Sequence, residues 1–361
     1  MSALPGNGLD SNNVKIFMEG DKLYDEMCHA MELAKNEILL ESYIFSLDAI
    51  GEKFIEILNE KAGQGVIVKL HLDAVGSHYY QNGKDFKKIL HDSISLKWFH
   101  QWNWRRPWQF NVRNHRKLLI IDRQYVFIGG FNVHRESSLL YFGKNRWRDS
   151  HIALESEAAM LVARYFDDLW YRRRQVFYDV YKEVCFMPNL SRRCRYLLRC
   201  QLSQLINTAK SSVEVTTPYF VPDEYLIKDL IQASCRGVNV SLLVPKNGDH
   251  PIINAMAWRY YSRLSQSKIK VFAYLPRMLH AKTIVVDSRI VVIGSANMDY
   301  RSFFVNHELV CLFVSEEVAE ELSDQFKLDC KVAEFVTSES QHPVRFWWLR
   351  RPMVELIKHW M

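Results

Sequence analysis

Two copies of one short motif contain the side chains that are best suited to chemistry in this chain. The spacing His-x-Lys-x4-Asp occurs at His115, Lys117 and Asp122, and again at His280, Lys282 and Asp287. Residues two apart in an extended strand share a face, so each histidine is expected to point the same way as its lysine. A neutral imidazole can attack phosphorus, a protonated one can give a proton to a leaving alkoxide, and lysines can neutralise phosphate oxygens. The motif pair therefore indicates phosphoryl transfer that uses neither a metal nor another cofactor.

The two aspartates of the motif are interpreted as turn anchors more readily than as direct participants in chemistry. Asp122 and Asp287 lie an odd number of residues after their histidines, and each begins a tight hairpin turn. They remain among the candidate catalytic residues because they complete the repeated motif.

Carboxylates are expected to orient the two imidazoles, as they do in catalytic triads. Asp149 and Glu308 occupy comparable positions downstream of the two histidines and are the candidates for this role. The alternative for each is a surface salt bridge, with Arg148 or Arg301.

Asparagines and loop histidines also repeat around the motifs. Asn132 and Asn297 each follow a pair of small residues that allow a ligand to approach the backbone, so their amides are candidate phosphate contacts. His78 and His250 follow equivalent strands and are candidate pocket residues, although loop histidines are usually solvated.

The elements that must hold these residues are duplicated as well. The segments Gly65 to Leu70 and Gly237 to Leu242 match one another, as do the two motif regions, in the same order along the chain. Each half alternates strand-length apolar runs with helical spacing and then forms a strand hairpin, over Leu118 to Ile128 and Thr283 to Ile293. The pattern predicts two α/β sandwich domains. Packed about a pseudo-twofold axis, they would bring both motifs into one shared active site.

Domain boundaries are expected where this pattern breaks. We predict a first domain over residues 1–175, a linker over 176–200, a second domain over 201–340 and a tail over 341–361. The linker is inferred from Met187-Pro188-Asn189 and the basic run that follows it. The basic, aromatic tail fits either a membrane-interface helix or a packed terminal helix.

The amino-acid composition indicates the cellular compartment and the kind of surface that the protein meets. The chain has a formal charge of +6, and it has neither a run of apolar residues long enough to span a bilayer nor the pattern of a signal peptide. Its seven cysteines fit neither a disulfide framework nor a zinc ribbon, so we interpret them as reduced thiols facing a cytosol. Tryptophans cluster beside arginines at 102–108 and 347–360, which suits a membrane interface or stacking on single-stranded nucleic acid.

At these residues the sequence resembles the phospholipase D superfamily, whose mark is His-x-Lys-x4-Asp twice per chain. Within it, the sequence looks like the bacterial cardiolipin synthases through Glu41 to Phe45, Thr217 to Asp223 and Gly294 to Phe303. The resemblance implies transfer of a phosphatidyl group through a phosphohistidine, with His115 as the nucleophile and His280 as the acid and base.

The resemblance also implies partners and a location. The substrates would be phospholipids, phosphatidylglycerol first and phosphatidylethanolamine as another donor, and no nucleic acid is expected. Longer members of the family begin with two transmembrane helices, which this sequence lacks. It would therefore reach an anionic membrane surface as a peripheral protein on the cytoplasmic face of the bacterial inner membrane. The alternatives are a phospholipase D-type phosphodiesterase that hydrolyses phospholipid or nucleic acid, and a non-catalytic lipid-binding scaffold, against which both intact motifs argue.

Overall fold

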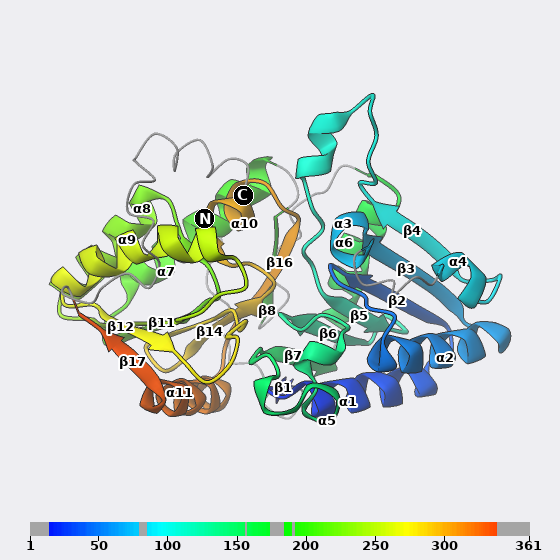
Figure 1. Cartoon of the computed structure of the whole chain (residues 1–361), viewed down its shortest axis with the longest axis horizontal. Coiled ribbons are helices and arrows are strands. Elements are labelled where there is room, and N and C mark those ends of the chain that lie inside the picture. The colour runs from blue at the N-terminus through cyan, green and yellow to red at the C-terminus, as the bar shows by residue number, and fades with distance from the viewer. Residues whose placement is uncertain (1–13, 79–84, 156, 174–183, 190–191, 338–361) are drawn as a thin grey trace.

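The computed structural model describes residues 14–78, 85–155, 157–173, 184–189 and 192–337, which form two α/β halves lying side by side (Figure 1). The first half is built on a seven-stranded sheet and the second on an eight-stranded sheet. In both sheets, parallel strands are continued by an antiparallel hairpin. The predicted duplicated α/β fold is therefore confirmed.

The first half runs from strand β1 to helix α6. Its strands are β1 (Val14–Phe17), β2 (Glu37–Ser42), β3 (Ile67–Asp73), β4 (Ser95–Phe99), β5 (Leu118–Ile121), β6 (Tyr125–Gly129) and β7 (His151–Glu155). Its helices are α1 (Gly20–Leu33), α2 (Ala49–Gly63), α3 (Ala74–His78), α4 (Phe86–Ile89), α5 (Leu139–Phe142) and α6 (Ala159–Trp170), with the 3₁₀ turns η2 (Pro107–Asn111), η3 (Arg135–Ser137) and η4 (Gly143–Asn145).

The second half runs from strand β8 to strand β17. Its strands are β8 (Val184–Asn189), β9 (Ser212–Thr216), β10 (Phe220–Val221), β11 (Asn239–Pro245), β12 (Lys270–Tyr274), β13 (Thr283–Val286), β14 (Ile290–Gly294), β15 (Met298–Asp299), β16 (Glu308–Val314) and β17 (Ala333–Val336). Its helices are α7 (Arg192–Thr208), α8 (Glu224–Cys235), α9 (Pro251–Gln266), α10 (Tyr300–Phe304) and α11 (Glu316–Lys331).

Both sheets have the same strand order, and this order decides where the motifs lie. The order is β1-β7-β6-β5-β2-β3-β4 in the first half and β8-β16-β14-β13-β9-β11-β12 in the second, which adds β17 at its edge. Strands β5 and β13 are antiparallel to β2 and β9, so they begin at the edge where the parallel strands end. Each His-Lys motif immediately precedes β5 or β13. Both motifs therefore lie at the carboxyl edge of the parallel strands, where α/β proteins commonly bind ligands.

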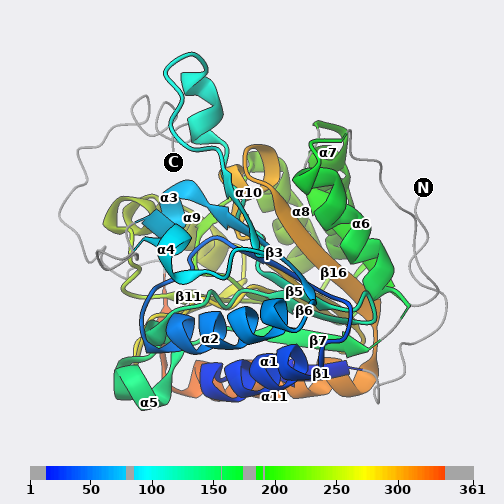
Figure 2. The same cartoon turned by 90° about the vertical axis from the view of Figure 1, so that its right-hand side faces the viewer.

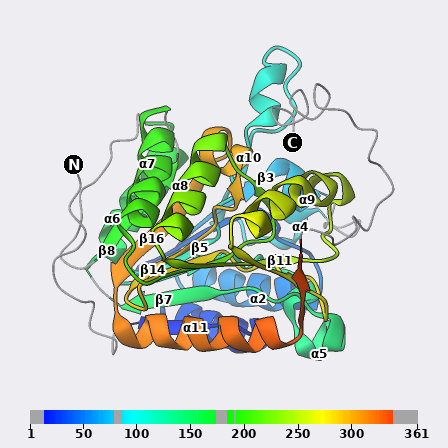
Figure 3. The ribbon, with the colours of Figure 1, turned by 90° about the vertical axis from the view of Figure 1, so that its left-hand side faces the viewer.

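Alternation along β5 explains how both faces of the first sheet are covered. Leu119 and Ile121 pack in the cluster that contains α1 and α2, whereas Leu118 and Ile120 pack in the cluster that contains α6. Burying an apolar side chain of this size is worth about 1.5–3 kcal/mol. Figure 2 shows α1 and α2 along one face of the first sheet, and Figure 3 shows α7 and α8 on the opposite face of the second sheet from α11.

The two sheets also pack against one another through a shared apolar cluster. It combines Ile120 and Ile128 of the first half with Val291, Ile293 and Phe313 of the second, and all five side chains are buried. The two halves therefore form one body, and the loops at their boundary are held from both sides.

The predicted linker over 176–200 is wrong in its second part. Residues 184–189 form β8, which pairs with β16 at the edge of the second sheet, and α7 begins at Arg192. Pro188 is tolerated within this strand because an edge strand needs hydrogen bonds on one side only. Residues 174–183 and the predicted tail over 341–361 lie outside the described residues.

Two further findings concern membrane-spanning helices and cysteine thiols. Among the described residues, no helix combines the length and the hydropathy that crossing a bilayer requires. The thiols of Cys28, Cys200, Cys235, Cys311 and Cys330 are free in the structure.

Candidate active site

Backbone hydrogen bonds across the boundary between the halves bring the two motifs together. The His115 N–H donates to the carbonyl of His307 at 2.9 Å, and the His280 N–H donates to the carbonyl of Arg148 at 2.7 Å. Each motif is therefore fixed to a segment of the opposite half. The exchange is reciprocal, as expected of two repeats packed about a pseudo-twofold axis.

Each imidazole contacts a carboxylate of the opposite half. His115 Nδ1 lies 3.0 and 3.1 Å from the two carboxylate oxygens of Glu308, and His280 Nδ1 lies 2.5 Å from Asp149 Oδ2. All four side chains are buried. An Nδ1–H that donates to a carboxylate leaves the lone pair on Nε2, where it can act as a nucleophile or a base. The sequence indicated both carboxylates, but not that they cross between the halves.

Two hydroxyls hold the Glu308 carboxylate. The Oγ of Ser295 donates to one oxygen and the Oγ of Ser302 donates to the other, the latter at 3.1 Å. These bonds leave the carboxylate little freedom to turn away from His115, so the orientation of the imidazole is fixed in turn.

Asp149 is held in a different way. The Ser150 N–H donates to Asp149 Oδ1 at 2.8 Å, and Lys282 Nζ lies 3.7 Å from Oδ2. Burial raises the pKa of Asp149, but Lys282 and His280 outweigh it, so the pKa is lowered and the carboxylate is charged. Gly130 takes the place of a serine here, because a Cβ at this position would lie 2.0 Å from Asp149 Oδ1. The two sides of the site are therefore not equivalent.

The two motif lysines are buried close enough to influence one another. Burial lowers the pKa of Lys282 to about 8, and burial together with nearby Lys282 lowers the pKa of Lys117 well below its ordinary value. Lys117 Nζ donates to the carbonyl of His115 at 2.6 Å, and Lys282 Nζ donates to that of His280. Two crowded ammonium groups favour an anion between them. The described residues contain no group of three or more histidine, cysteine or carboxylate side chains placed to hold a metal ion.

Burial also lowers the pKa of both histidines. It brings the pKa of His280 to about 4 with the help of Lys282, and it outweighs the opposing effect of Glu308 on His115. Both imidazoles are therefore neutral at pH 7 before a substrate binds, which is the form that a nucleophile needs. An anionic phosphodiester raises the pKa of neighbouring bases, so the acid can take up its proton as the substrate binds.

Aromatic rings lie against both histidines. The ring centre of Tyr43 lies 5.1 Å from that of His115, and the ring centre of Trp147 lies 5.0 Å from that of His280. Lys117 Nζ lies 5.2 Å from the centre of the Tyr43 ring. The rings restrict the imidazoles and keep water away from them.

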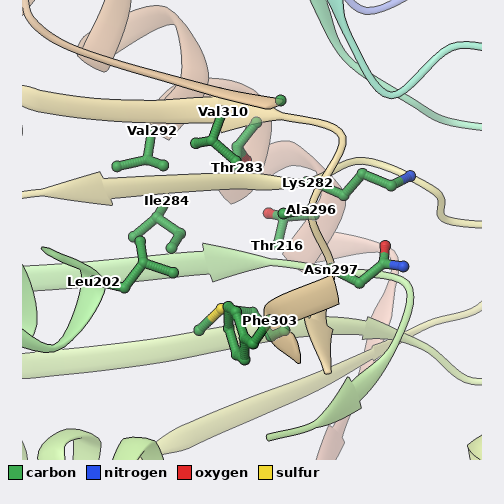
Figure 4. Close-up of a pocket in the computed structure, with 12 residues that line it drawn as sticks. Leu202, Thr216, Lys282, Thr283, Ile284, Val292, Ala296, Asn297, Phe303 and Val310 are labelled. Atoms are coloured by element: carbon green, nitrogen blue, oxygen red, sulfur yellow. The ribbon is translucent and has the colours of Figure 1, made fainter. Parts of the chain in front are cut away.

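The two predicted asparagines lie in different surroundings. Asn132 Oδ1 accepts the Ile44 N–H at 3.1 Å, whereas Asn297 Oδ1 is buried with no hydrogen-bond partner. Figure 4 shows the ends of Asn297 and Lys282 pointing to the same side, next to a small cavity of about 20 Å³ lined mainly by apolar side chains. The amide of Asn297 is thus the better placed of the two to contact a ligand beside Lys282.

The predicted catalytic role of Asp122 and Asp287 is wrong, and the turn-anchor interpretation holds. Asp122 accepts the N–H groups of residues 35–37 at 2.7 to 2.8 Å, and Asp287 accepts those of residues 210–212 at 2.7 to 3.0 Å. Each lies at the far end of β5 or β13 from its histidine. Their φ angles of 50° and 53° place both in the left-handed conformation that tight hairpin turns require.

The two loop histidines lie apart from the histidine pair. His78 is exposed at the end of α3, and His250 is exposed before α9, 3.7 Å from Asp249. The ring centre of His250 lies 5.7 Å from that of Tyr219, which donates to Asp249 at 2.7 Å. No hydrogen bond or ion pair within the described part of the chain joins His78 or His250 to the central imidazoles.

Sequence reasoning gave no role to four residues that the structure places at the site. Tyr43 and Trp147 do not repeat between the halves, so the comparison of repeats could not find them. Ser295 and Ser302 could have been found from the rule that a buried carboxylate is hydrogen-bonded, because they lie 13 and 6 residues before Glu308.

Comparison with solved structures shows how widely this fold occurs. Phosphatidylserine synthase from Haemophilus influenzae matches with a TM-score of 0.71 at 12% identity, covering 98% of this chain and 94% of that one. Polyphosphate kinase from Porphyromonas gingivalis matches with a TM-score of 0.63 at 13% identity, covering 99% of this chain and 56% of the kinase. At these identities the likeness concerns the fold alone. The class defined by fold and site together is a duplicated α/β protein with a composite histidine–lysine site at the boundary between its halves.

Sequence comparison defines the family. The family model described as "Cardiolipin synthase, PLD-like domain" matches residues 27–170 and 202–330, one segment in each half. Cardiolipin synthase from Clostridium perfringens is 33% identical over 351 residues, covering 91% of this chain and 72% of the relative. Cardiolipin synthase A from Pseudomonas fluorescens is 32% identical over 352 residues, covering 93% and 72%. The chain belongs to the cardiolipin synthase family of the phospholipase D superfamily.

Proposed function

We propose that the protein is a cardiolipin synthase that transfers a phosphatidyl group from one phosphatidylglycerol to another through a phosphohistidine. The crossed pairing is the main support, because each imidazole is buried against a carboxylate of the opposite half and beside a lysine. Two oriented bases and two lysines are what phosphoryl transfer without a nucleotide requires. Family membership directs this chemistry to phospholipids.

The first step forms the covalent intermediate. His115 Nε2 attacks the phosphorus of phosphatidylglycerol, the P–O bond to the head-group glycerol breaks, and protonated His280 gives its Nε2 proton to the departing oxygen. Lys117 and Lys282 stabilise the charge on the non-bridging phosphate oxygens. The products are a phosphatidyl group on His115 and free glycerol.

The second step transfers the phosphatidyl group to lipid. His280, now neutral, removes the proton from the terminal hydroxyl of a second phosphatidylglycerol. The resulting oxygen attacks phosphorus, and the P–N bond to His115 breaks. Two phosphatidylglycerol molecules thus become one cardiolipin and one glycerol, and the site returns to its starting state.

Water competes with the second lipid and would give phosphatidic acid instead. The rings of Tyr43 and Trp147 lie against the two histidines, and both histidines are buried. A site that admits little water favours a lipid hydroxyl as the acceptor. This observation favours transfer over hydrolysis.

Phosphatidylglycerol is the donor that we propose, and phosphatidylethanolamine is the other candidate because the same displacement would release ethanolamine. We propose that the protein works peripherally, on the anionic cytoplasmic face of the bacterial inner membrane. The formal charge of +6 and the free thiols support this location.

Lipid mass spectrometry tests the proposed function. Purified protein incubated with phosphatidylglycerol vesicles should form cardiolipin and glycerol in equal amounts, while His115→Ala and His280→Ala should form none. His29→Ala, which changes an exposed histidine on α1, is the matched control and should behave as the wild type. Phosphatidic acid as the only new phospholipid would identify a hydrolase, and the absence of any new lipid would refute the proposal.

A further inference from the structure

We infer that two exposed apolar elements, each connected along the chain to the site, dock the protein on an anionic lipid bilayer. The aromatic finger is residues 101–112, which connect β4 to the segment before β5 and include η2. The apolar turn is helix α5, residues 139–142. The inference rests on the proposed function in one respect: a diacyl substrate stays in its bilayer, so a buried histidine pair must be brought to the bilayer surface.

The aromatic finger projects from the body of the molecule (Figures 1 and 3). Trp102, Trp104 and Trp108 are 64%, 75% and 68% exposed, and the guanidinium of Arg105 lies 5.3 Å from the centre of the Trp104 ring. No acidic residue occurs from 101 to 117. Exposed tryptophans beside arginines fit the head-group region of an anionic bilayer, where the ring is partly buried and the cation meets phosphate.

The apolar turn presents a second surface of the same kind. All four of its side chains are exposed, Leu140 by 76%. The turn is fixed to the body of the protein because the Leu139 N–H donates to the Asp21 carboxylate at 2.7 Å. No acidic residue occurs from 137 to 148, and Lys144 lies two residues after the turn. An apolar cluster of this size held open to water points to a binding surface.

Both elements lead directly into the site. The aromatic finger ends just before Arg113, two residues from His115, and Arg301 of the other half donates to the side chain and carbonyl of Asn111 at 2.8 and 2.6 Å. The apolar turn is followed by Trp147, which lies against His280. Each element therefore leads along the chain to a residue that lies close to one of the two histidines.

The two elements also face a common side of the molecule. Figures 2 and 3 show the aromatic finger at one end and α5 at the other, both displaced toward the side on which α3 and α9 lie. The two elements therefore lie toward one side of the molecule, and the aliphatic Leu139 and Leu140 contribute nothing to stacking on nucleic acid bases. A bilayer with anionic head groups matches both the exposed apolar side chains of the two elements and the basic residues beside them.

Vesicle sedimentation tests the inference with one double variant in each element. Trp104→Ser/Trp108→Ser and Leu139→Ser/Leu140→Ser should each lower the ratio of bound to free protein about tenfold on vesicles of phosphatidylglycerol and phosphatidylcholine. Leu328→Ser changes a leucine on α11 that is 54% exposed, and this matched control should bind as the wild type. Unchanged binding of both double variants would overturn the inference.

Turnover separates loss of docking from loss of folded protein. We compare turnover on long-chain vesicles with turnover on a short-chain, water-soluble phosphatidylglycerol, because the folded fraction cancels from the ratio of the two rates. In each double variant this ratio should fall about tenfold, since only the vesicle reaction requires docking. If the wild type makes no cardiolipin from either donor, the proposed function fails while the vesicle result still decides the inference. If the double variants lost single-stranded DNA binding or self-association while their vesicle binding stayed intact, the two elements would not be a lipid-binding surface.

Discussion

At the scale of single residues, the site depends on a carboxylate from the opposite half of the chain that contacts each histidine. Glu308 holds His115 and is itself held by Ser295 and Ser302, whereas Asp149 holds His280 in contact with Lys282. The serine-bonded carboxylate keeps the His115 imidazole fixed, and burial keeps that imidazole neutral, which suits a nucleophile. The carboxylate at His280 stabilises the imidazolium that an acid must become.

Substitution of the two carboxylates should separate these roles. With a phosphatidyl ester of p-nitrophenol, whose leaving group needs no proton, Asp149→Asn should release the first equivalent of nitrophenolate at nearly the wild-type rate. Glu308→Gln should remain slowed about 100-fold with this donor, because its defect lies at the nucleophile. Rapid-mixing absorbance measures the release. An equal response of the two variants, or the reverse order, would contradict the assignment.

Lys282 should impose an alkaline limit on activity. Burial lowers its pKa to about 8, so the charged form is present below that pH and is lost as the pH rises through it. We therefore expect kcat/KM, which reports on the free enzyme, to fall above about pH 8. Lys282→Arg should move the decline to higher pH in any activity that it retains. A profile that stays flat up to pH 10 would remove Lys282 from the chemistry.

At the scale of elements, the hairpin turns have a structural task. Asp122 connects the turn between β5 and β6 to the start of β2, and Asp287 does the same in the second half. Each aspartate therefore fixes the far end of the strand that follows its histidine.

Removal of the Asp122 carboxylate should lower the stability of the fold and not the catalytic rate. Asp122→Ala should lower the free energy of unfolding by about 1–3 kcal/mol, because three exposed or partly buried backbone N–H groups lose a charged acceptor. Urea denaturation measures this loss, and the exposed Asp92→Ala is the matched control. The backbone bonds lower the pKa of Asp122, so the stabilisation is present near neutral pH and is lost as the pH falls below about 4. A large fall in kcat of the folded variant, without a loss of stability, would restore Asp122 to the catalytic residues.

Repetition made much of the fold and site predictable. Two copies of His-x-Lys, of the strands around them and of a downstream carboxylate indicated the duplicated α/β fold and most of the site residues. The crossed pairing was not predictable, because spacing describes one half at a time. How the halves dock is decided by apolar contacts such as those of Ile128 and Val291, which carry no motif. The linker was misplaced because Pro188 was interpreted as a break, whereas an edge strand accepts proline.

At the scale of the whole molecule, the two halves make one composite site whose positive charge comes from lysines. We expect cardiolipin formation to survive dialysis against EDTA within about twofold, because Lys117 and Lys282 stabilise the phosphate oxygens. The measurement is the initial rate before and after chelation. Complete loss of activity that one divalent metal restores would contradict a lysine-based site.

We propose that the phosphatidyl group passes through His115, and trapping the covalent intermediate tests this role most directly. The protein is mixed with short-chain phosphatidylglycerol, quenched at alkaline pH within the first turnover and mapped by peptide mass spectrometry. We expect the added mass of a phosphatidyl group on the peptide that contains His115, and no adduct in the His115→Ala protein. An adduct on His280 in the His115→Ala protein, or cardiolipin accumulating with no adduct on either histidine, would contradict it.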